Sequence, residues 1–370
     1  MLFTRLGVTA FGGPAAHIAM MQEEVVRRRK WLSDEEFLDL LSATQLIPGP
    51  NSTEMAIHIG HRRAGFAGLL VAGACFIIPA VVIVLALARI YVQFGSLPAL
   101  AGMLDCVKPV IIAIVLQAVW NLGRSAVKNT RLAVVGAGAL AANLCGLSEL
   151  ATLAAAAVAT LGLHAASATT VRRNTLKAIE PFALFGLSAG VEAASANAAP
   201  AIVASLFGIF AKIGAVLYGS GYVLLAFVEA EFVHQRNWLT QTQLLDAVAV
   251  GQLTPGPVFT TATFVGYIIA GYSGAMAATG GIFLPAFLFV AISGPIVPRM
   301  RRSPLIGVLL DGVNVASLAL MAAVIIELGR HAITTPLGGL LLTAAGLALL
   351  KYRINSTWII AGAAIIGLLR

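Results

Sequence analysis

Charged residues are scarce in this sequence of 370 residues, because Asp, Glu, Lys and Arg together make up 11% of it. Soluble globular domains carry roughly a quarter charged residues. Hydrophobic residues reach 59%, and the mean hydropathy is +0.92. These values exclude a water-soluble fold of ordinary composition, and we predict an integral membrane protein.

Cysteine is also scarce, since Cys75, Cys106 and Cys145 lie in or beside apolar segments without CxxC spacing. This pattern excludes a disulfide framework and a cysteine zinc site. His58 and His61 have a spacing that could hold a metal, but no further Cys or His stands close to them in the sequence. We therefore predict no metal.

Motifs of nucleotide-driven and catalytic proteins are missing as well. No Walker A motif is present, and no GxGxxG or GxSxG stands in the strand–turn–helix context that these motifs require. Neither ATP-driven transport within this chain nor hydrolase chemistry has support from the sequence. We predict that the protein is not an enzyme and uses no cofactor.

Positive charge exceeds negative charge, with 24 Lys and Arg against 16 Asp and Glu, a net charge of +8. The basic residues cluster in short runs between apolar segments, where the positive-inside rule accounts for them, so nucleic acid is excluded as a partner. The first apolar stretch carries Arg5 and lacks a basic n-region. We expect it to remain as the first helix and not to be a cleaved signal.

The chain contains an internal duplication. Residues 3–80 align with 210–286 through a single one-residue gap near Gly60, and about two dozen of roughly 80 positions are identical. We predict a first repeat at 1–170, a cytoplasmic connector at 171–200 and a second repeat at 201–370. Matched pairs include Gly7 with Gly214, Gly12 with Gly219, Glu24 with Glu231, Arg29 with Arg236, Trp31 with Trp238, Asp39 with Asp246, Gln45 with Gln252 and Pro79 with Pro285.

Each repeat contains a helix that is too short to cross a bilayer. The first runs over about 14 residues, 34–47, or roughly 21 Å against a hydrocarbon core near 30 Å. The Pro-Gly-Pro run at 48–50 then breaks it, and a second short helix follows to about Arg62 and Arg63. The pattern recurs at 240–254, Pro-Gly-Pro and 258–267, and predicts a re-entrant hairpin in each repeat.

The remaining apolar stretches predict the transmembrane spans. Placing the basic flanks of the first hairpin in the cytoplasm gives five crossings in the first half, which inverts the second half. We predict an all-α integral membrane protein with two inverted-topology repeats, each of about five transmembrane helices plus a re-entrant hairpin. The other stretches are 66–93, 107–123, 131–147, 149–166, 305–328, 335–350 and 354–369, and 179–195 could form a surface helix.

The returning half-helices begin at the hairpin tips, so their free amides and positive dipole ends favour an anion. A bent backbone inside the bilayer must also be buried in protein or line a polar cavity. The alternative is that the hydroxyl residues only cap their helices. The predicted substrate-binding residues near the tips are Gly12, Gly13, Gln45, Gly49, Asn51, Ser52, Thr53, Gln252, Gly256, Thr260 and Thr261.

Arg5 and Lys212 occupy matching positions in the first helix of each repeat. A cation in hydrocarbon is costly without a partner, so we predict that they act as counter-charges to an oxyanion, although Arg5 could instead snorkel to the surface. The candidate proton carriers are Glu24, Glu54 and Glu231. The alternative for Glu24 is an ion pair with nearby arginines.

Three ordered segments resemble the signature of the CHR family of chromate ion transporters: the FGGPAAH run at 11–17, the EVVRRRKWL run at 24–32 and the QLIPGPNS run at 45–52. The resemblance spans the full length, because long members of the family have two homologous domains. It implies a multi-pass inner-membrane protein that expels chromate, a tetrahedral dianion similar to sulfate, using the proton gradient.

In that family the FGGP and PGP motifs are functional elements, which correspond here to 12–14 and 48–52. The second repeat departs from the pattern, because Gly219-Ser220-Gly221 lacks proline and Val258-Phe259 replaces Asn51-Ser52. We therefore expect the first repeat to contribute more polar contacts. His17, replaced by Leu224 in the second repeat, is expected to be a structural or gating residue.

These observations predict a secondary transporter of a small oxyanion. Chromate follows from the resemblance, and sulfate or a related dianion is the alternative that the residues themselves leave open. Two further classes are a passive anion channel and a membrane enzyme such as a chromate reductase, which would need a cofactor. The expected partners are the oxyanion, protons, membrane lipid and a second copy of the chain.

Overall fold

The computed structural model describes the chain except for residues 12, 96, 168–197, 219–220, 302, 334, 353 and 370. The described residues form helices and no strand. The predicted connector therefore lies almost wholly outside the described residues, as do Gly12, Gly219 and Ser220. The first described helix after this gap is α9 (Ala198–Val216).

The two halves contain similar series of helices, except that α2 of the first half is matched by the short elements η4 and α10 and that η6 occurs in the second half alone among the described residues. In the first half these are α1 (Leu2–Thr9), α2 (Gly13–Gln22), η1 (Glu23–Arg28), α3 (Asp34–Thr44), α4 (Asn51–Phe94), α5 (Pro98–Ala126), α6 (Thr130–Leu144) and α7 (Glu149–Ser167). In the second they are α9, η4 (Gly221–Val223), α10 (Leu224–Val228), η5 (Glu229–Gln235), α11 (Gln241–Leu253), η6 (Val258–Thr260), α12 (Thr261–Arg301), α13 (Pro304–Ala332), α14 (Pro336–Leu350) and α15 (Ser356–Leu368).

Two pairs of matching helices have equal lengths and matching starts. Helices α5 and α13 each have 29 residues and proline in the first turn, where its missing amide costs nothing. Helices α6 and α14 each have 15 residues and are capped by Asn129 and Thr335, whose side chains accept backbone amides. The duplication detected at 3–80 therefore continues through the rest of each half.

Five of the described helical segments are long and apolar enough to cross a membrane, namely 51–94, 100–126, 149–166, 258–294 and 304–332. Four more apolar helices are shorter, of 10–17 residues: Thr130–Leu144, Pro200–Val216, Pro336–Leu350 and Ser356–Leu368. A 15-residue helix spans about 22 Å, less than the hydrocarbon core. The chain is thus a multi-pass membrane protein, and the part that the structure describes contains fewer helices of full spanning length than the ten spans that we predicted.

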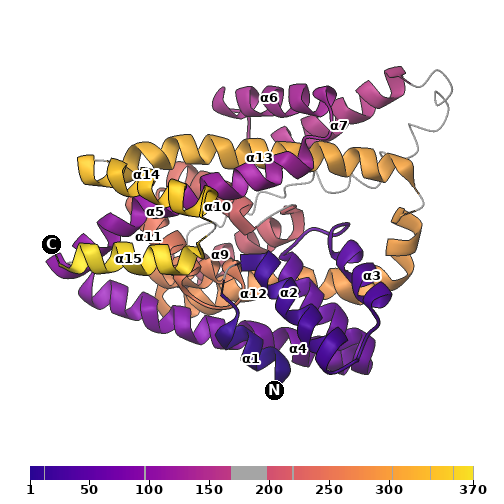
Figure 1. The fold of residues 1–370 in the computed structure, drawn as a ribbon, viewed down its shortest axis with the longest axis horizontal. Helices are drawn as coiled ribbons and strands as arrows, with labels where there is room; N and C mark the ends of the chain where they lie inside the picture. The colour runs from indigo at the N-terminus through magenta and orange to yellow at the C-terminus, as the bar shows by residue number, and fades with distance from the viewer. Residues whose placement is uncertain are drawn as a thin grey trace.

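The long helices run side by side in Figure 1, with α6 and α7 along the upper edge of α13 and with α14 and α15 beside α5 at the left. Helices α1, α2 and α3 gather beside α4, and α12 packs against both α9 and α4. The two halves are therefore intertwined, because α4 and α12 are the corresponding helices of the two repeats.

Both short helices are present, and a helix follows each Pro-Gly-Pro run; these following helices are the segments predicted to return. A capping box starts each short helix, with Ser33 at the first and Thr240 at the second. The returning segments join the following spans through a break, where Ala64 has φ −147° and Gly65 has φ 58°. The break recurs at Ala270 (φ −142°) and Gly271 (φ 61°). Glycine supplies the positive φ of this sharp turn.

Candidate functional site

The two Pro-Gly-Pro tips contact the opposite repeat in a reciprocal way. The Gly49 amide donates to the carbonyl of Leu217 at the end of α9 (2.8 Å), and the Gly256 amide donates to the carbonyl of Ala10 at the end of α1 (3.0 Å). These are corresponding atoms of the two repeats. The ends of α1 and α9 therefore supply the carbonyls that accept the amide hydrogens of the two tips. Each tip is bound by the other half of the chain.

Both tips are buried in protein. Gly49 has φ 137° and Gly256 has φ 88°, values that favour glycine. A Cβ added at Gly49 would collide with the carboxyl group of Glu54 and approach Ala286 of α12. At Gly256 it would meet Ala80 of α4 and the carbonyl of Gly7. Each tip is thus seated against the long helix of the other repeat.

The first turn of α4 buries polar groups that lack partners. Ser52, Thr53 and Glu54 are 3%, 0% and 0% exposed. Neither the Thr53 hydroxyl nor either carboxylate oxygen of Glu54 has a hydrogen-bond partner among the described residues. Buried polar groups are nearly always paired, and exceptions call for a functional explanation. Burial without a partner is a tertiary property that the sequence pattern alone does not reveal.

His17 connects the second tip to the start of α4. Its Nε2 lies 3.0 Å from the Ala10 carbonyl oxygen and its Nδ1 lies 3.3 Å from the Ser52 hydroxyl. A carbonyl only accepts, so Nε2 carries the proton and Nδ1 accepts from Ser52. The Ala10 carbonyl also accepts from Gly256, so one network runs from the second tip to the returning helix of the first.

We predict that His17→Leu lowers the thermal stability of the protein. Leucine stands at the matching position of the second repeat, but at 17 it would leave the buried Ser52 hydroxyl unpaired, a cost of about 1–3 kcal/mol. The melting temperature of the purified protein in detergent measures the effect. His17→Gln keeps a donor and an acceptor and is the matched control. An unchanged melting temperature in His17→Leu would contradict the network.

The second returning helix is less polar. Thr260 and Thr261 donate their hydroxyls to the carbonyls of Pro257 and Val258, each at 2.8 Å. Both threonine hydroxyls are therefore satisfied within their own turn in this conformation. This is not an N-cap, because the hydroxyls donate to carbonyls and the N-cap position is Pro257, without a side-chain cap hydrogen bond. Gln252 accepts from the Tyr222 hydroxyl at 3.3 Å.

The other predicted residues are less enclosed. Gln45 is exposed at the end of α3, and Asn51 is half-buried at the start of α4. Gly13 begins α2 with φ 77°.

The predicted counter-charges are both in ion pairs with matched glutamates. Arg5 pairs with Glu24, and Lys212 lies 2.7 Å from Glu231. Each glutamate has a second partner five residues along the chain, at 3.2 Å for Arg29 and 2.5 Å for Arg236. This spacing follows from η1 and η5, because π-helical turns bring residues i and i+5 together.

The pairing keeps Glu24 ionised. Burial alone would raise the pKa of Glu24, but the hydrogen bonds and charges of Arg5, Arg29 and Arg28 outweigh it and hold the pKa below its ordinary value. Glu231 has the same arrangement of partners. Of the three glutamates predicted as proton carriers, Glu54 is therefore the one without an ion pair in the described structure.

A cavity of about 230 Å³, lined by apolar as well as polar side chains, lies on the flank of the first hairpin. Its charged and polar lining comes from Asp39 of α3, from His58, His61 and Arg62 of α4, and from Ser293 of α12. His58 is 6% exposed, and its Nε2 has no hydrogen-bond partner in the described part of the chain. His58 lies one helical turn after Glu54, so the cavity approaches the buried carboxyl group along one face of α4.

The matching flank of the second hairpin is filled. Asp246, which corresponds to Asp39, is 2% exposed. Its carboxylate accepts from the Tyr91 hydroxyl at 2.9 Å and lies 3.4 Å from the Lys108 ammonium. The same region of the two repeats is thus open in one and closed in the other.

Comparison with known protein families gives one match in each half of the chain. The family model for chromate transporters matches residues 1–166 and 204–368. A chromate transport protein of Cupriavidus metallidurans is 33% identical over 370 residues, which cover 100% of this chain and 91% of that protein. A chromate transport protein of Pseudomonas aeruginosa is 33% identical, over 99% of this chain and 90% of that protein.

A probable chromate transport protein of Synechococcus elongatus is 30% identical, over 99% of this chain and 93% of that protein. No solved structure matches the chain. The family match covers both halves, including both tips and both ion-paired glutamates. The chain therefore belongs to the chromate transporter family.

Proposed function

We propose that this protein is a secondary active transporter that exports chromate across the inner membrane. The observation that carries the proposal is the family match in both halves, together with relatives named as chromate transport proteins along nearly the whole chain. Transport also fits an all-helical membrane protein whose helices break at matched positions.

In this proposal the two repeats have inverted topology, and each hairpin is re-entrant. The reciprocal bonds of Gly49 and Gly256 support a two-fold relation between the repeats, because each half gives the same carbonyl to the other. A two-fold axis in the membrane plane would bring the hairpins in from opposite sides, with both tips near mid-depth.

The dianion binds between the starts of the two returning helices, where free amides and the dipoles are electropositive. The unpartnered hydroxyl of Thr53 is a ready donor. Asn51, Ser52, Thr260 and Thr261 reorient toward the anion when the tips separate. Arg5 and Lys212 remain in their ion pairs and leave each cluster with excess positive charge, which attracts the anion.

Glu54 carries the coupled proton, and His58 and His61 carry it between the cavity and Glu54. An ionised Glu54 beside a dianion is unfavourable, since two unit charges 4 Å apart repel by roughly 4 kcal/mol at an effective dielectric constant of about 20. The proton and the dianion therefore bind together. Outward movement of the complex still carries negative charge, and an inside-negative potential drives it with about 2.3 kcal/mol per charge per 100 mV. In this scheme the membrane potential drives export, in place of the inward proton gradient that the family resemblance implies.

The difference between the two hairpin flanks fits one end state of an alternating-access cycle. The first flank is open at its cavity, and the second is closed by Tyr91 and Lys108 on Asp246. Rocking of one repeat against the other would exchange the two states.

Uptake of radiolabelled chromate into inside-out membrane vesicles tests the proposal. We expect saturable uptake that responds to an imposed proton gradient and acidifies the vesicle lumen, as co-binding of a proton requires. Exchange of a proton for chromate would make the lumen alkaline instead. If neither chromate nor sulfate moves, the proposed function is wrong.

Sulfate is the alternative substrate, because its charge and tetrahedral shape match those of chromate. Competition by unlabelled sulfate in the same vesicles distinguishes the two. A passive anion channel is the other alternative, and flux that does not saturate and ignores proton uncouplers would favour it.

We predict that Lys212→Ala lowers the chromate transport rate by about tenfold, equivalent to about 1.4 kcal/mol. Removing the ammonium leaves Glu231 with Arg236 and cancels the excess positive charge of the cluster. Flux in proteoliposomes, normalised to inserted protein, measures the change. Lys212→Arg keeps the charge and should retain transport. Wild-type flux in Lys212→Ala would exclude Lys212 from the transport site.

A further inference from the structure

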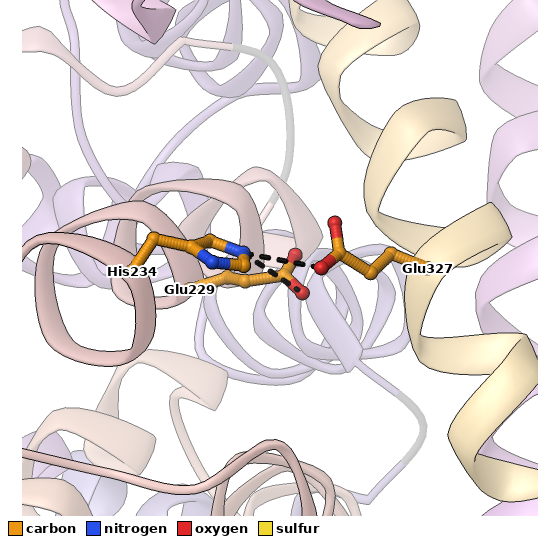
Figure 2. Close-up of side chains that lie close together, drawn as sticks. All are labelled: Glu229, His234 and Glu327. Atoms are coloured by element: carbon orange, nitrogen blue, oxygen red, sulfur yellow. Dashed lines mark ion pairs between the residues drawn. The ribbon is translucent and has the colours of Figure 1, made fainter. Parts of the chain in front are cut away.

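Three metal-ligating side chains converge at the base of the second hairpin, away from both tips. Glu229 and His234 come from η5, and Glu327 comes from the last turns of α13. Figure 2 shows the imidazole of His234 directed between the two carboxylates. One donor atom from each residue lies within 4.8 Å of the other two.

The donor separations suit a bound cation. The Nε2 atom of His234 lies 3.2 Å from an oxygen of Glu327 and 3.9 Å from an oxygen of Glu229. Ligands held about 2.1 Å from a tetrahedral ion lie roughly 3.4 Å from one another. The π-helical turn explains the convergence, because Glu229 and His234 are five residues apart. Small side-chain shifts would therefore complete the coordination.

The cluster has too little positive charge for its two carboxylates. Glu229 is 3% exposed in its side chain, yet no lysine or arginine of the described ranges forms an ion pair with it or with Glu327. Burying a carboxylate is costly without a cation. By contrast, the neighbouring Glu231 in the same η5 segment has both Lys212 and Arg236.

Gln241 is a fourth candidate ligand. Its amide nitrogen donates to Glu229 (2.8 Å) and to Glu327 (3.2 Å). Its amide oxygen is buried and has no hydrogen-bond partner within the described structure. Rotating the amide by half a turn would direct this oxygen toward the ion. This unsatisfied oxygen is an observation independent of the carboxylate cluster.

The first repeat lacks these ligand residues at the matching positions. The corresponding residues are Gln22, Arg27 and Asn121, and Arg27 pairs with Glu23 instead. Arginine cannot ligate a metal, because it stays protonated in proteins. The cluster is therefore specific to the second repeat. In the first repeat, arginine occupies the position of the histidine.

We propose that Glu229, His234 and Glu327 bind one divalent transition-metal ion, with Gln241 as an additional oxygen ligand. One imidazole with carboxylate oxygens suits Zn²⁺, Co²⁺ or Mn²⁺. The bound ion cross-links the base of the second hairpin to α13. This site is separate from the proposed chromate site, and the metal-site proposal does not depend on the transport proposal.

Binding of Zn²⁺ and Co²⁺ to the tag-free full-length protein in lipid nanodiscs tests the site. We expect one equivalent of Zn²⁺ by titration calorimetry and a visible Co²⁺ absorption band from an ordered site. His234→Arg, which copies the first repeat, should weaken binding by at least about 100-fold, because loss of a second-shell partner alone costs about 10–100-fold and this variant removes a ligand. Glu327→Gln should weaken it as well, and it removes the more exposed of the two carboxylates.

His331→Gln is the matched control. His331 lies near Glu327 on α13 and is exposed, and glutamine adds no cation that could pair with Glu327, so this variant should bind Zn²⁺ like the wild type. Absence of stoichiometric Zn²⁺ or Co²⁺ binding in the wild type would overturn the proposal. So would equal affinity in His234→Arg or in Glu327→Gln, provided that the variant keeps the wild-type circular dichroism spectrum.

Discussion

We expect Glu54→Gln to abolish the proton movement that accompanies chromate transport and to make the transport rate independent of pH. Glutamine resembles the protonated carboxyl group in size and charge, so the dianion can bind without a proton. In the wild type, by contrast, transport should fall as rising pH removes the proton from Glu54. A pH-sensitive dye and labelled chromate in the same proteoliposomes measure both fluxes.

The fold should tolerate this substitution. Glu54 is fully buried and forms no hydrogen bond in the described structure, so glutamine breaks no contact. Glu24→Gln is the contrasting variant, because it removes the partner of Arg5, Arg28 and Arg29 and should lower stability while proton coupling persists. Proton flux that continues in Glu54→Gln would assign coupling to another residue.

The second large effect is expected for Gly49→Ala, which should eliminate chromate transport. An added Cβ would collide with the Glu54 carboxyl group at a backbone φ of 137°. Backbone strain and overpacking together cost roughly 2–5 kcal/mol. Either the Glu54 carboxyl group or the tip itself would have to move, which changes the geometry of the proposed site. Gly256→Ala should have the same consequence at the second tip.

Gly146→Ala separates the effect of backbone strain from the effect of the steric collision. Gly146 also has a positive φ, 95°, but no atom lies close enough to meet an added Cβ. It follows α6, away from both tips, so this variant should show only a strain of about 1–2 kcal/mol and normal transport. Wild-type chromate flux in Gly49→Ala would show that the tip is not part of the transport pathway.

Local backbone features of the fold could be predicted from the sequence. The Pro-Gly-Pro runs predict the helix breaks because proline removes amide donors. The Ser33 and Thr240 capping boxes begin α3 and α11 within a residue of the predicted starts. Family membership followed from three motifs, and the comparisons confirm it. These features depend on local chemistry, which residue order determines directly.

Contacts between distant segments could not be predicted. No pattern indicates that the Gly49 amide binds the carbonyl of Leu217, because the partner lies in the other repeat. The pairing of Lys212 with Glu231 depends on how α9 packs beside η5. A basic residue at matching positions of both repeats is compatible with an ion pair and with an anion-binding site. Only the packing of the helices distinguishes these two roles.

The metal-ligand cluster illustrates the same limit. His234 and Glu229 stand five residues apart, a spacing that does not share a face on an ordinary α-helix. The π-helical turn brings them together, and Glu327 arrives from a helix almost a hundred residues later. The signal that could have found them is the change from arginine to histidine between matching positions 27 and 234.

Electron cryo-microscopy of the protein in lipid nanodiscs, with and without chromate, tests the central claim most directly. We predict that the two hairpins enter from opposite sides of the lipid belt, with both tips near mid-depth. Chromate should add density between 51–53 and 260–261 that is absent without it. Hairpins that enter from the same side, or chromate density located away from both tips, would contradict the account.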